Sequence, residues 1–123
     1  MASLEKLIEQ MKKLVEALNT KETAKKMVQE WLKGYYGKIF AFDFGEKKFY
    51  LVFTPEEVRF EEGEYPAPDL LIRTDVESWS AMATGKTKWS TLLKEGKLTI
   101  IGSAHEIPVL MKLAFTAGVL PTG

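Results

Sequence analysis

The chain has 123 residues, of which 46% are hydrophobic and 28% are charged, proportions typical of one soluble globular domain. Its 17 Lys and Arg residues balance 17 Asp and Glu residues, so the net charge argues against nucleic acid as a partner. With no cysteine, disulfides, thiol catalysis and cysteine-based zinc sites are excluded. No apolar run long enough to span a bilayer and no signal peptide stand out, and we expect a cytoplasmic protein.

Two amphipathic helices are predicted at the start of the chain. Residues 4–18 carry apolar side chains at the i, i+3, i+4, i+7 spacing, with Ser3 as the expected N-cap. A second helix follows the break at Asn19-Thr20 and ends at Gly34. Both apolar stripes are typical of helix faces that pack on a core.

The apolar period then changes from 3.6 to 2, which indicates β-strands. Residues 38–44 and 47–54 alternate in this way, and Gly45-Glu46 between them predicts a hairpin turn. Three further strands each centre on a pair of inward apolar residues: Val58 and Phe60, Leu70 and Ile72, and Leu98 and Ile100. One face of this sheet is crowded with aromatic and branched side chains, so helices must cover it.

The opposite face of the predicted sheet is less polar than a freely solvated face should be. By alternation it carries Ile39, Ala41, Tyr50, Val52, Leu71 and Ile101. Two explanations are left open. Either the first helix covers part of this face, or two copies pair sheet to sheet in a homodimer, which is the hypothesis we prefer.

Three more helices are expected to cover the inner face. Asp75 is the expected N-cap of a helix over 76–83, and a second short helix begins near Trp89. The start of the last helix is ambiguous. Residues 103–106 (Ser-Ala-His-Glu) match a capping box, which would place Pro108 five residues into the helix. Either the helix starts near Ile107, with Pro108 in its first turn, or it begins with a kink.

No set of residues forms a recognisable catalytic site. Residues 84–87 (Thr-Gly-Lys-Thr) resemble the end of a phosphate-binding loop, but Ser80 replaces the required glycine and a helix precedes them. The single histidine, His105, is expected to be a capping or surface residue. Glu56-Glu57 and Glu61-Glu62 are expected to be edge-strand charges that discourage aggregation. We therefore expect no enzyme activity, no metal site and no cofactor.

The helices expected on the inner face carry a surplus of apolar side chains. These are Trp79, Met82, Trp89, Leu92, Leu93, Leu110, Met111 and Phe115. An ordinary tight core is one interpretation, and spacing alone favours it. The methionines point the other way, because methionine adapts to irregular ligand shapes and a largely apolar pocket suits a lipid.

An ordered set of short motifs resembles the sterol carrier protein type 2 (sterol-transfer) domain family. The motifs are Gly37-Lys-Ile-Phe-Ala-Phe42, Pro68-Asp-Leu-Leu-Ile-Arg-Thr-Asp75, Met82-Ala-Thr-Gly-Lys86, Gly96-Lys-Leu-Thr-Ile-Ile-Gly102 and Leu110-Met-Lys-Leu113. The resemblance covers residues 20–118. It implies an α+β domain over residues 1–123, with N-terminal helices at 4–33 and the sheet with its roofing helices at 37–118.

The resemblance further implies a five-stranded, mostly antiparallel sheet with helices on one face and an apolar tunnel between the two layers. The protein would bind and carry a fatty acid, acyl thioester, sterol or phospholipid without catalysis, and the final helix would gate the tunnel. The tunnel walls would be Phe40, Phe42, Trp79, Met82, Trp89, Leu93, Leu98, Leu110, Met111 and Phe115.

Two alternatives concern partners other than the lipid. The domain could be a homodimeric accessory or structural module whose pocket is vestigial and carries nothing. The lysine-rich first helices could also make transient contact with a membrane, although the net charge does not favour this.

Overall fold

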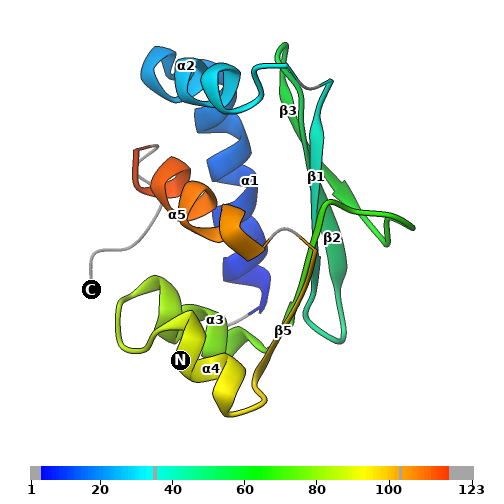
Figure 1. Ribbon diagram of the computed structural model, residues 1–123, viewed down its shortest axis with the longest axis vertical. Helices are drawn as coiled ribbons and strands as arrows, with labels where there is room; N and C mark the ends of the chain where they lie inside the picture. Colours follow the sequence, from blue (N-terminus) through cyan, green and yellow to red (C-terminus); the bar gives the residue numbers. More distant parts are fainter. Residues whose placement is uncertain (1–3, 35, 103, 117–123) are drawn as a thin grey trace.

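The computed structural model describes residues 4–34, 36–102 and 104–116. Figure 1 shows a sheet with all the helices gathered on one side of it. In chain order the elements are α1 (Leu4–Thr20), α2 (Glu22–Trp31), β1 (Lys38–Asp43), β2 (Lys48–Phe53), β3 (Val58–Glu62), β4 (Leu70–Thr74), α3 (Val76–Ala83), α4 (Trp89–Lys94), β5 (Leu98–Gly102), the 3-10 turn η1 (Ala104–Glu106) and α5 (Ile107–Thr116).

The two N-terminal helices are confirmed where the apolar spacing predicted them. Leu7, Leu14 and Leu18 of α1 are buried, since the 3.6-residue period keeps them on one face. At the end of α1 the Asn19 amide donates from Nδ2 to the Val58 carbonyl at 2.8 Å and accepts from the Val58 N–H at 2.7 Å. The Asn19 side chain thus links α1 to β3, because it pairs with the backbone N–H and C=O of Val58 as a neighbouring strand would. The expected cap Ser3 lies outside the described residues.

The strands form one mixed sheet in the order β3-β2-β1-β4-β5. All neighbouring pairs are antiparallel except β1 and β4, which are parallel. Phe42 lies opposite Phe49 on β2 and Ile72 on β4, so inward side chains stack across three strands. The predicted hairpin turn is confirmed: Gly45 has a φ of +85°, and the Phe44 N–H donates to the Lys47 carbonyl at 2.9 Å.

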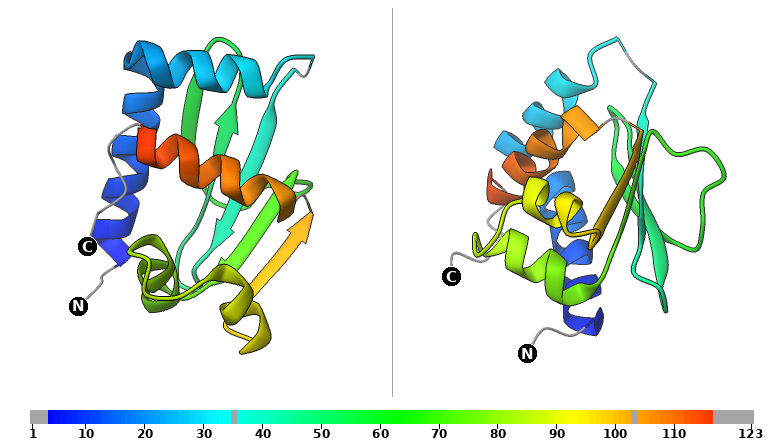
Figure 2. Two further views of the ribbon diagram at one scale, coloured as in Figure 1. Left: turned by 60° about the vertical axis from the view of Figure 1, so that its left-hand side comes forward. Right: turned by 60° about the horizontal axis from the view of Figure 1, so that its bottom comes forward.

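The helices cover a single face of the sheet, which we call the inner face. In Figure 2 α1 runs along the β3 side of the sheet and α5 lies over its middle. α2 lies at one end of the sheet, and α3 and α4 lie at the opposite end. The alternative that α1 covers part of the opposite, outer face is therefore wrong. Instead, residues 63–69 leave the sheet on the outer side, where the Tyr65 ring centroid lies 5.3 Å from that of Tyr50.

Short-range signals explain α3 and the turn after it. The Asp75 carboxylate accepts from the Ser78 N–H at 2.7 Å, which confirms the predicted N-cap. After the helix, the N–H groups of Lys86 and Thr87 both donate back to the Ala81 carbonyl, at 2.8 and 3.3 Å. Because these backbone N–H groups donate to a carbonyl of the same chain, they are not free to bind a phosphate, in agreement with the rejection of a phosphate-binding loop.

The conflict at the last helix is resolved in favour of the later start. α5 begins at Ile107, and Pro108 is its second residue, where a missing N–H costs nothing. A 3-10 turn, η1 (Ala104–Glu106), runs directly into this helix, and the Glu106 side chain pairs with Lys38 on β1. Ser103, the N-cap of the expected capping box, lies outside the described residues.

Candidate functional site

The inner face of the sheet is lined by aromatic rings that pack edge to face and in offset stacks. Trp79 of α3 stands edge-on to Phe42 and Phe44, with ring centroids 5.6 and 6.1 Å apart. Phe49 stacks on Phe42 at 5.1 Å and on Phe60 at the same distance. Alternation places these phenylalanines on one face, and α3 brings the tryptophan to them.

A second aromatic group lies at the α2 end of the inner face. Trp31 stands edge-on to Phe40 and Phe53, with centroids 5.3 and 5.1 Å apart. Phe40 and Phe53 are themselves 5.3 Å apart and completely buried. Aromatic side chains therefore line the inner face both at its α2 end and beneath α3.

One ion pair interrupts this apolar interior. Lys38 of β1 and Glu106 of η1 are 9% and 7% exposed, and the lysine Nζ binds the Glu106 Oε1. The same Nζ lies 4.9 Å from the Trp31 ring centroid, in position for a cation–π contact. Within the described part of the chain, Glu106 Oε2 is buried and accepts no hydrogen bond. The pair ties the start of α5 to the sheet.

The neighbouring histidine is a surface residue, as predicted. The His105 side chain is 81% exposed, and its Nε2 lies 4.0 Å from Glu106 Oε1. The same Glu106 oxygen pairs with Lys38, so the contacts of His105 and Glu106 in the described part of the chain are ionic.

Nine of the ten residues expected to line a tunnel fall into three groups by exposure. Five are buried in the inner core: Phe40, Phe42, Trp79, Leu98 and Leu110. Met82 and Met111 are partly buried and pack against that core. Trp89 and Leu93, which lie four residues apart on α4, are 37% and 38% exposed. Phe115 belongs to α5, and its side chain lies outside the described residues.

Sequence reasoning missed the Lys38–Glu106 pair. One signal was available, because the alternation that turns Phe40 and Phe42 inward also turns Lys38 inward. A lysine at an inward position needs a buried acidic partner or an exit to solvent. The partner itself, 68 residues later in the chain, had no local signal.

Three hollows lie among the residues that the structure describes, and none of these three is lined by Trp79, Trp89 or Leu110. A cavity of about 480 Å³ lies on the outer face, and one of about 250 Å³ lies where α1 meets the β1–β2 turn. The third, between α1, α2 and the β2–β3 turn, has a volume of only about 10 Å³. The tunnel between helices and sheet therefore stays a prediction.

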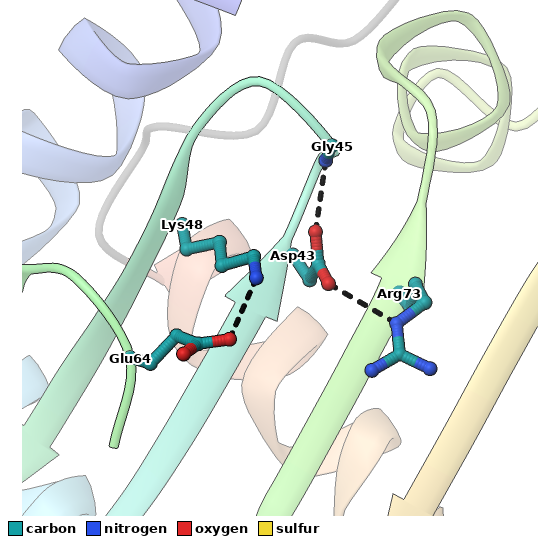
Figure 3. Close-up of polar contacts among 5 residues, drawn as sticks. All are labelled: Asp43, Gly45, Lys48, Glu64 and Arg73. Atoms are coloured by element: carbon teal, nitrogen blue, oxygen red, sulfur yellow. Dashed lines mark hydrogen bonds and ion pairs between the residues drawn. The ribbon is translucent and has the colours of Figure 1, made fainter.

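The outer face carries two ion pairs beside its cavity. Figure 3 shows Asp43 between Gly45 and Arg73, and Lys48 reaching Glu64. Asp43 Oδ1 accepts from the Gly45 N–H at 2.9 Å, Asp43 Oδ2 accepts from Arg73 Nε at 3.1 Å, and Lys48 Nζ donates to Glu64 at 2.6 Å. Burial alone would raise the pKa of Asp43, but the Gly45 N–H, Arg73 and Lys48 outweigh it and lower that pKa. Glu64 raises the pKa of Lys48.

Comparison with known proteins identifies the family. The family model described as "SCP-2 sterol transfer family" matches residues 8–116, which include the whole sheet and every helix but the first turn of α1. The chain belongs to the SCP-2 sterol transfer family. This membership supports a general role in lipid binding or transfer. A search of curated proteins finds no match. In the described residues no helix is both long and apolar enough to cross a membrane.

Solved structures share the SCP-2 fold at low sequence identity. "UbiJ-SCP2 Ubiquinone synthesis protein" superposes with a TM-score of 0.67 at 16% identity over 98% of both chains. Palmitated SCP2L2 from Aedes aegypti gives 0.56 at 19% identity, over 93% of this chain and 95% of that one. The sec-alkylsulfatase Pisa1 from Pseudomonas sp. gives 0.60 at 13% identity over 72% of this chain, which spans only 14% of that chain. At these identities the similarity shows the fold alone.

Proposed function

We propose that this protein binds and carries a lipid, without catalysis, in an apolar tunnel between its helices and the inner face of its sheet. The observation that carries the proposal is the match to the SCP-2 sterol transfer family over residues 8–116. The apolar inner face supports it, as does a fold shared with a protein described as palmitated. The ligand classes proposed are fatty acid, acyl thioester, sterol and phospholipid.

Burial of apolar surface would supply the affinity. At about 25 cal/mol per Å² of apolar area removed from water, a long acyl chain gains several kcal/mol. Part of this is lost in immobilising the chain, and what is left corresponds to roughly micromolar binding. A strong polar anchor is not needed for affinity of this order.

We assign the tunnel wall to the residues expected from the family resemblance. Phe40, Phe42, Trp79, Leu98 and Leu110 would form the deep wall, since they are buried and lie on the sheet and the helices that cover it. Met82, Met111 and Phe115 would line the path of the ligand. Trp89 and Leu93 are exposed on one side of α4 and would form the mouth.

Three further parts of the proposal concern context. A cytoplasmic location is supported by the absence of cysteine, which is compatible with a reducing compartment. Transient contact with a membrane is supported by the exposed pair Trp89 and Leu93 beside lysines at 86, 88 and 94. A homodimer is supported by Ile101, an apolar residue 52% exposed on the edge strand β5.

An accessory homodimer with a vestigial pocket is the competing function, and Ile101 is the observation that favours it. Native mass spectrometry of the freshly purified protein separates the two. The carrier predicts a monomer or dimer that retains about one lipid per chain. The accessory domain predicts a dimer without lipid.

Titration with the fluorescent fatty acid cis-parinaric acid completes the test. A lipid carrier binds this probe at micromolar concentration, and energy transfer from Trp79 accompanies binding. Protein that retains no lipid on purification and gives no parinaric acid signal at tens of micromolar overturns the carrier function.

A further inference from the structure

The cavity on the outer face of the sheet lies on the side opposite the helices. Its volume is about 480 Å³, within the range of small-molecule sites. Strands β1, β2 and β4 form its floor, and the segment from Gly63 to Pro68 forms its wall. We call this cavity the outer cleft. In Figure 2 the segment stands off the sheet on the side opposite the helices.

The outer cleft combines an apolar lining with charged groups. Ala41 and Leu71 lie on its floor, and Tyr65, Pro66 and Pro68 come from its wall. The Tyr65 ring is held beside Tyr50 at 5.3 Å, which orients the wall. Asp43, Lys48, Glu64 and Arg73 are also lining residues, so two positive and two negative side chains border one apolar hollow.

Most of the charged groups in the outer cleft already have partners. Both oxygens of the Asp43 carboxylate accept hydrogen bonds, from the Gly45 N–H and from Arg73 Nε. The lowered pKa of Asp43 agrees with a carboxylate that stays ionised in this position. Lys48 Nζ is joined to Glu64 at 2.6 Å. Each carboxylate that lines the cleft is therefore paired with a cation that lines it as well.

Arg73 differs from Lys48 in the shape of its remaining donors: its guanidinium uses only one of its three nitrogens, and the other two form a planar fork, whereas the Lys48 ammonium, which also has one partner, is a point charge. Nε donates to Asp43 at 3.1 Å, and the two terminal nitrogens donate to none of the described residues. Figure 3 shows these nitrogens pointing away from Asp43, and the side chain is 53% exposed. The guanidinium is held in place by Asp43 while its terminal pair of N–H groups stays available. A planar fork of this kind matches the two oxygens of a carboxylate.

We propose that the outer cleft binds an organic carboxylate with a short apolar body, at a site separate from the lipid tunnel. The carboxylate binds the terminal nitrogens of Arg73, and the apolar body lies against Leu71, Ala41 and Tyr65. A phosphate ester fits less well, because its charge of nearly two meets the carboxylates of Asp43 and Glu64. With a single exposed anchor, the dissociation constant is of millimolar order.

An NMR titration of the full chain tests this proposal. The probe is sodium 3-phenylpropionate, and the neutral 3-phenylpropanol is its matched control. We expect the acid to shift the backbone amides of Ala41, Asp43, Leu71 and Arg73, and to leave those of Leu98 and Leu110 unmoved. The alcohol should bind at least about tenfold more weakly. Equal binding of acid and alcohol, or shifts confined to the helix side, overturns the proposal.

Matched substitutions identify the anchor. Arg73→Gln should weaken binding of the acid at least about fivefold, and Arg73→Lys, which keeps the charge without the fork, should weaken it less. Arg59→Gln is the control, since Arg59 is an exposed arginine of β3 that does not line the cleft. If Arg73→Gln and Arg59→Gln bind the acid equally well, Arg73 is not the anchor and the proposal fails.

One variant separates the binding of the carboxylate in the outer cleft from the binding of lipid in the proposed tunnel. A Leu110→Trp variant, which should fill the tunnel, should bind 3-phenylpropionate as the unmodified chain does. Loss of parinaric acid binding with retention of 3-phenylpropionate binding supports two separate sites. Loss of both ligands together in this variant shows that the acid occupies the tunnel and overturns the second site.

Discussion

The two faces of the sheet differ although neighbouring residues of the same strands build them. On β4, Ile72 points to the inner face and is 1% exposed, while its neighbour Leu71 points to the outer face and is half-buried. The inner face is covered by helices and nearly free of charge. The outer face carries ion pairs and a cleft under residues 63–68. Because side chains alternate between the faces of a strand, neighbouring residues of one sheet lie in an environment shielded from water and in one that contacts it.

The difference shows how much an ion pair depends on where it lies. Lys38 and Glu106 lie on the inner face, where water cannot replace a lost partner. Asp43 and Arg73 lie on the outer face, where the arginine is 53% exposed and water can. The same type of contact should therefore contribute very differently to stability on the two faces.

The largest expected effect comes from breaking the inner ion pair. Lys38→Met should lower the free energy of unfolding by about 3–5 kcal/mol, because it leaves the Glu106 carboxylate buried without a cation. Urea denaturation measures this. The double variant Lys38→Met/Glu106→Leu should recover most of the loss, since it removes both charges. A double variant as unstable as the single one would show that packing, and not charge, sets the cost.

The next effect compares neighbours on β4. Ile72→Ala should cost about 2–5 kcal/mol, because it leaves a cavity in a close-packed core. Leu71→Ala should cost about 1 kcal/mol or less, since its side chain is only partly removed from water. Urea denaturation of the two variants under identical conditions gives the difference. Similar losses would mean that the outer face is as well packed as the inner one.

A smaller effect concerns the lipid tunnel. Leu110→Trp should weaken binding of cis-parinaric acid at least about tenfold, or about 1.4 kcal/mol, because the larger ring occupies the space of the ligand. Leu113→Trp is the matched control, since Leu113 is equally buried on α5 but is not assigned to the wall. Both variants should lose similar stability. If they bind the probe equally, Leu110 does not line the tunnel.

The smallest effect should be the pH dependence of the outer pair. The pKa of Asp43 is lowered from its ordinary value of 3.8, so the folded state favours the ionised form. Its contribution is present at neutral pH and is lost as the pH falls below about 4. The pair is partly exposed, so Asp43→Asn should cost less than about 1 kcal/mol at pH 7. The variant and the unmodified chain should converge in stability near pH 2, and a gap that widens on acidification would contradict this.

Most of the secondary structure could be predicted from short stretches of sequence. The period of α1, the alternation of the strands and the Asp75 cap all depend on residues within a few positions of one another. The beginning of α5 could not be predicted from them, because Glu106 had two uses. Its place in the Ser103–Glu106 motif suggests a local cap, but in the structure one of its oxygens pairs with Lys38, 68 residues earlier in the chain. The distant partner prevailed because a buried lysine without an acid is the more costly outcome.

The outer cleft was not predictable for a similar reason. Asp43 and Arg73 are 30 residues apart and meet because β4 pairs in parallel with β1. Alternation from Ala41 and Leu71 places both side chains on the outer face, but only the strand order makes them neighbours. The apolar residues of that face were recognised from sequence, whereas the segment that shelters part of them was not.

The sequence by itself determined the elements, the two faces of the sheet and, through ordered motifs, the family. These follow from local steric and hydrophobic preferences that each segment carries wherever it lies. Only the tertiary structure decided the position of α1, the start of α5 and the partners of Lys38, Asp43 and Arg73. Such choices depend on which distant segments come together, and the free energy of those contacts exists only in the assembled fold.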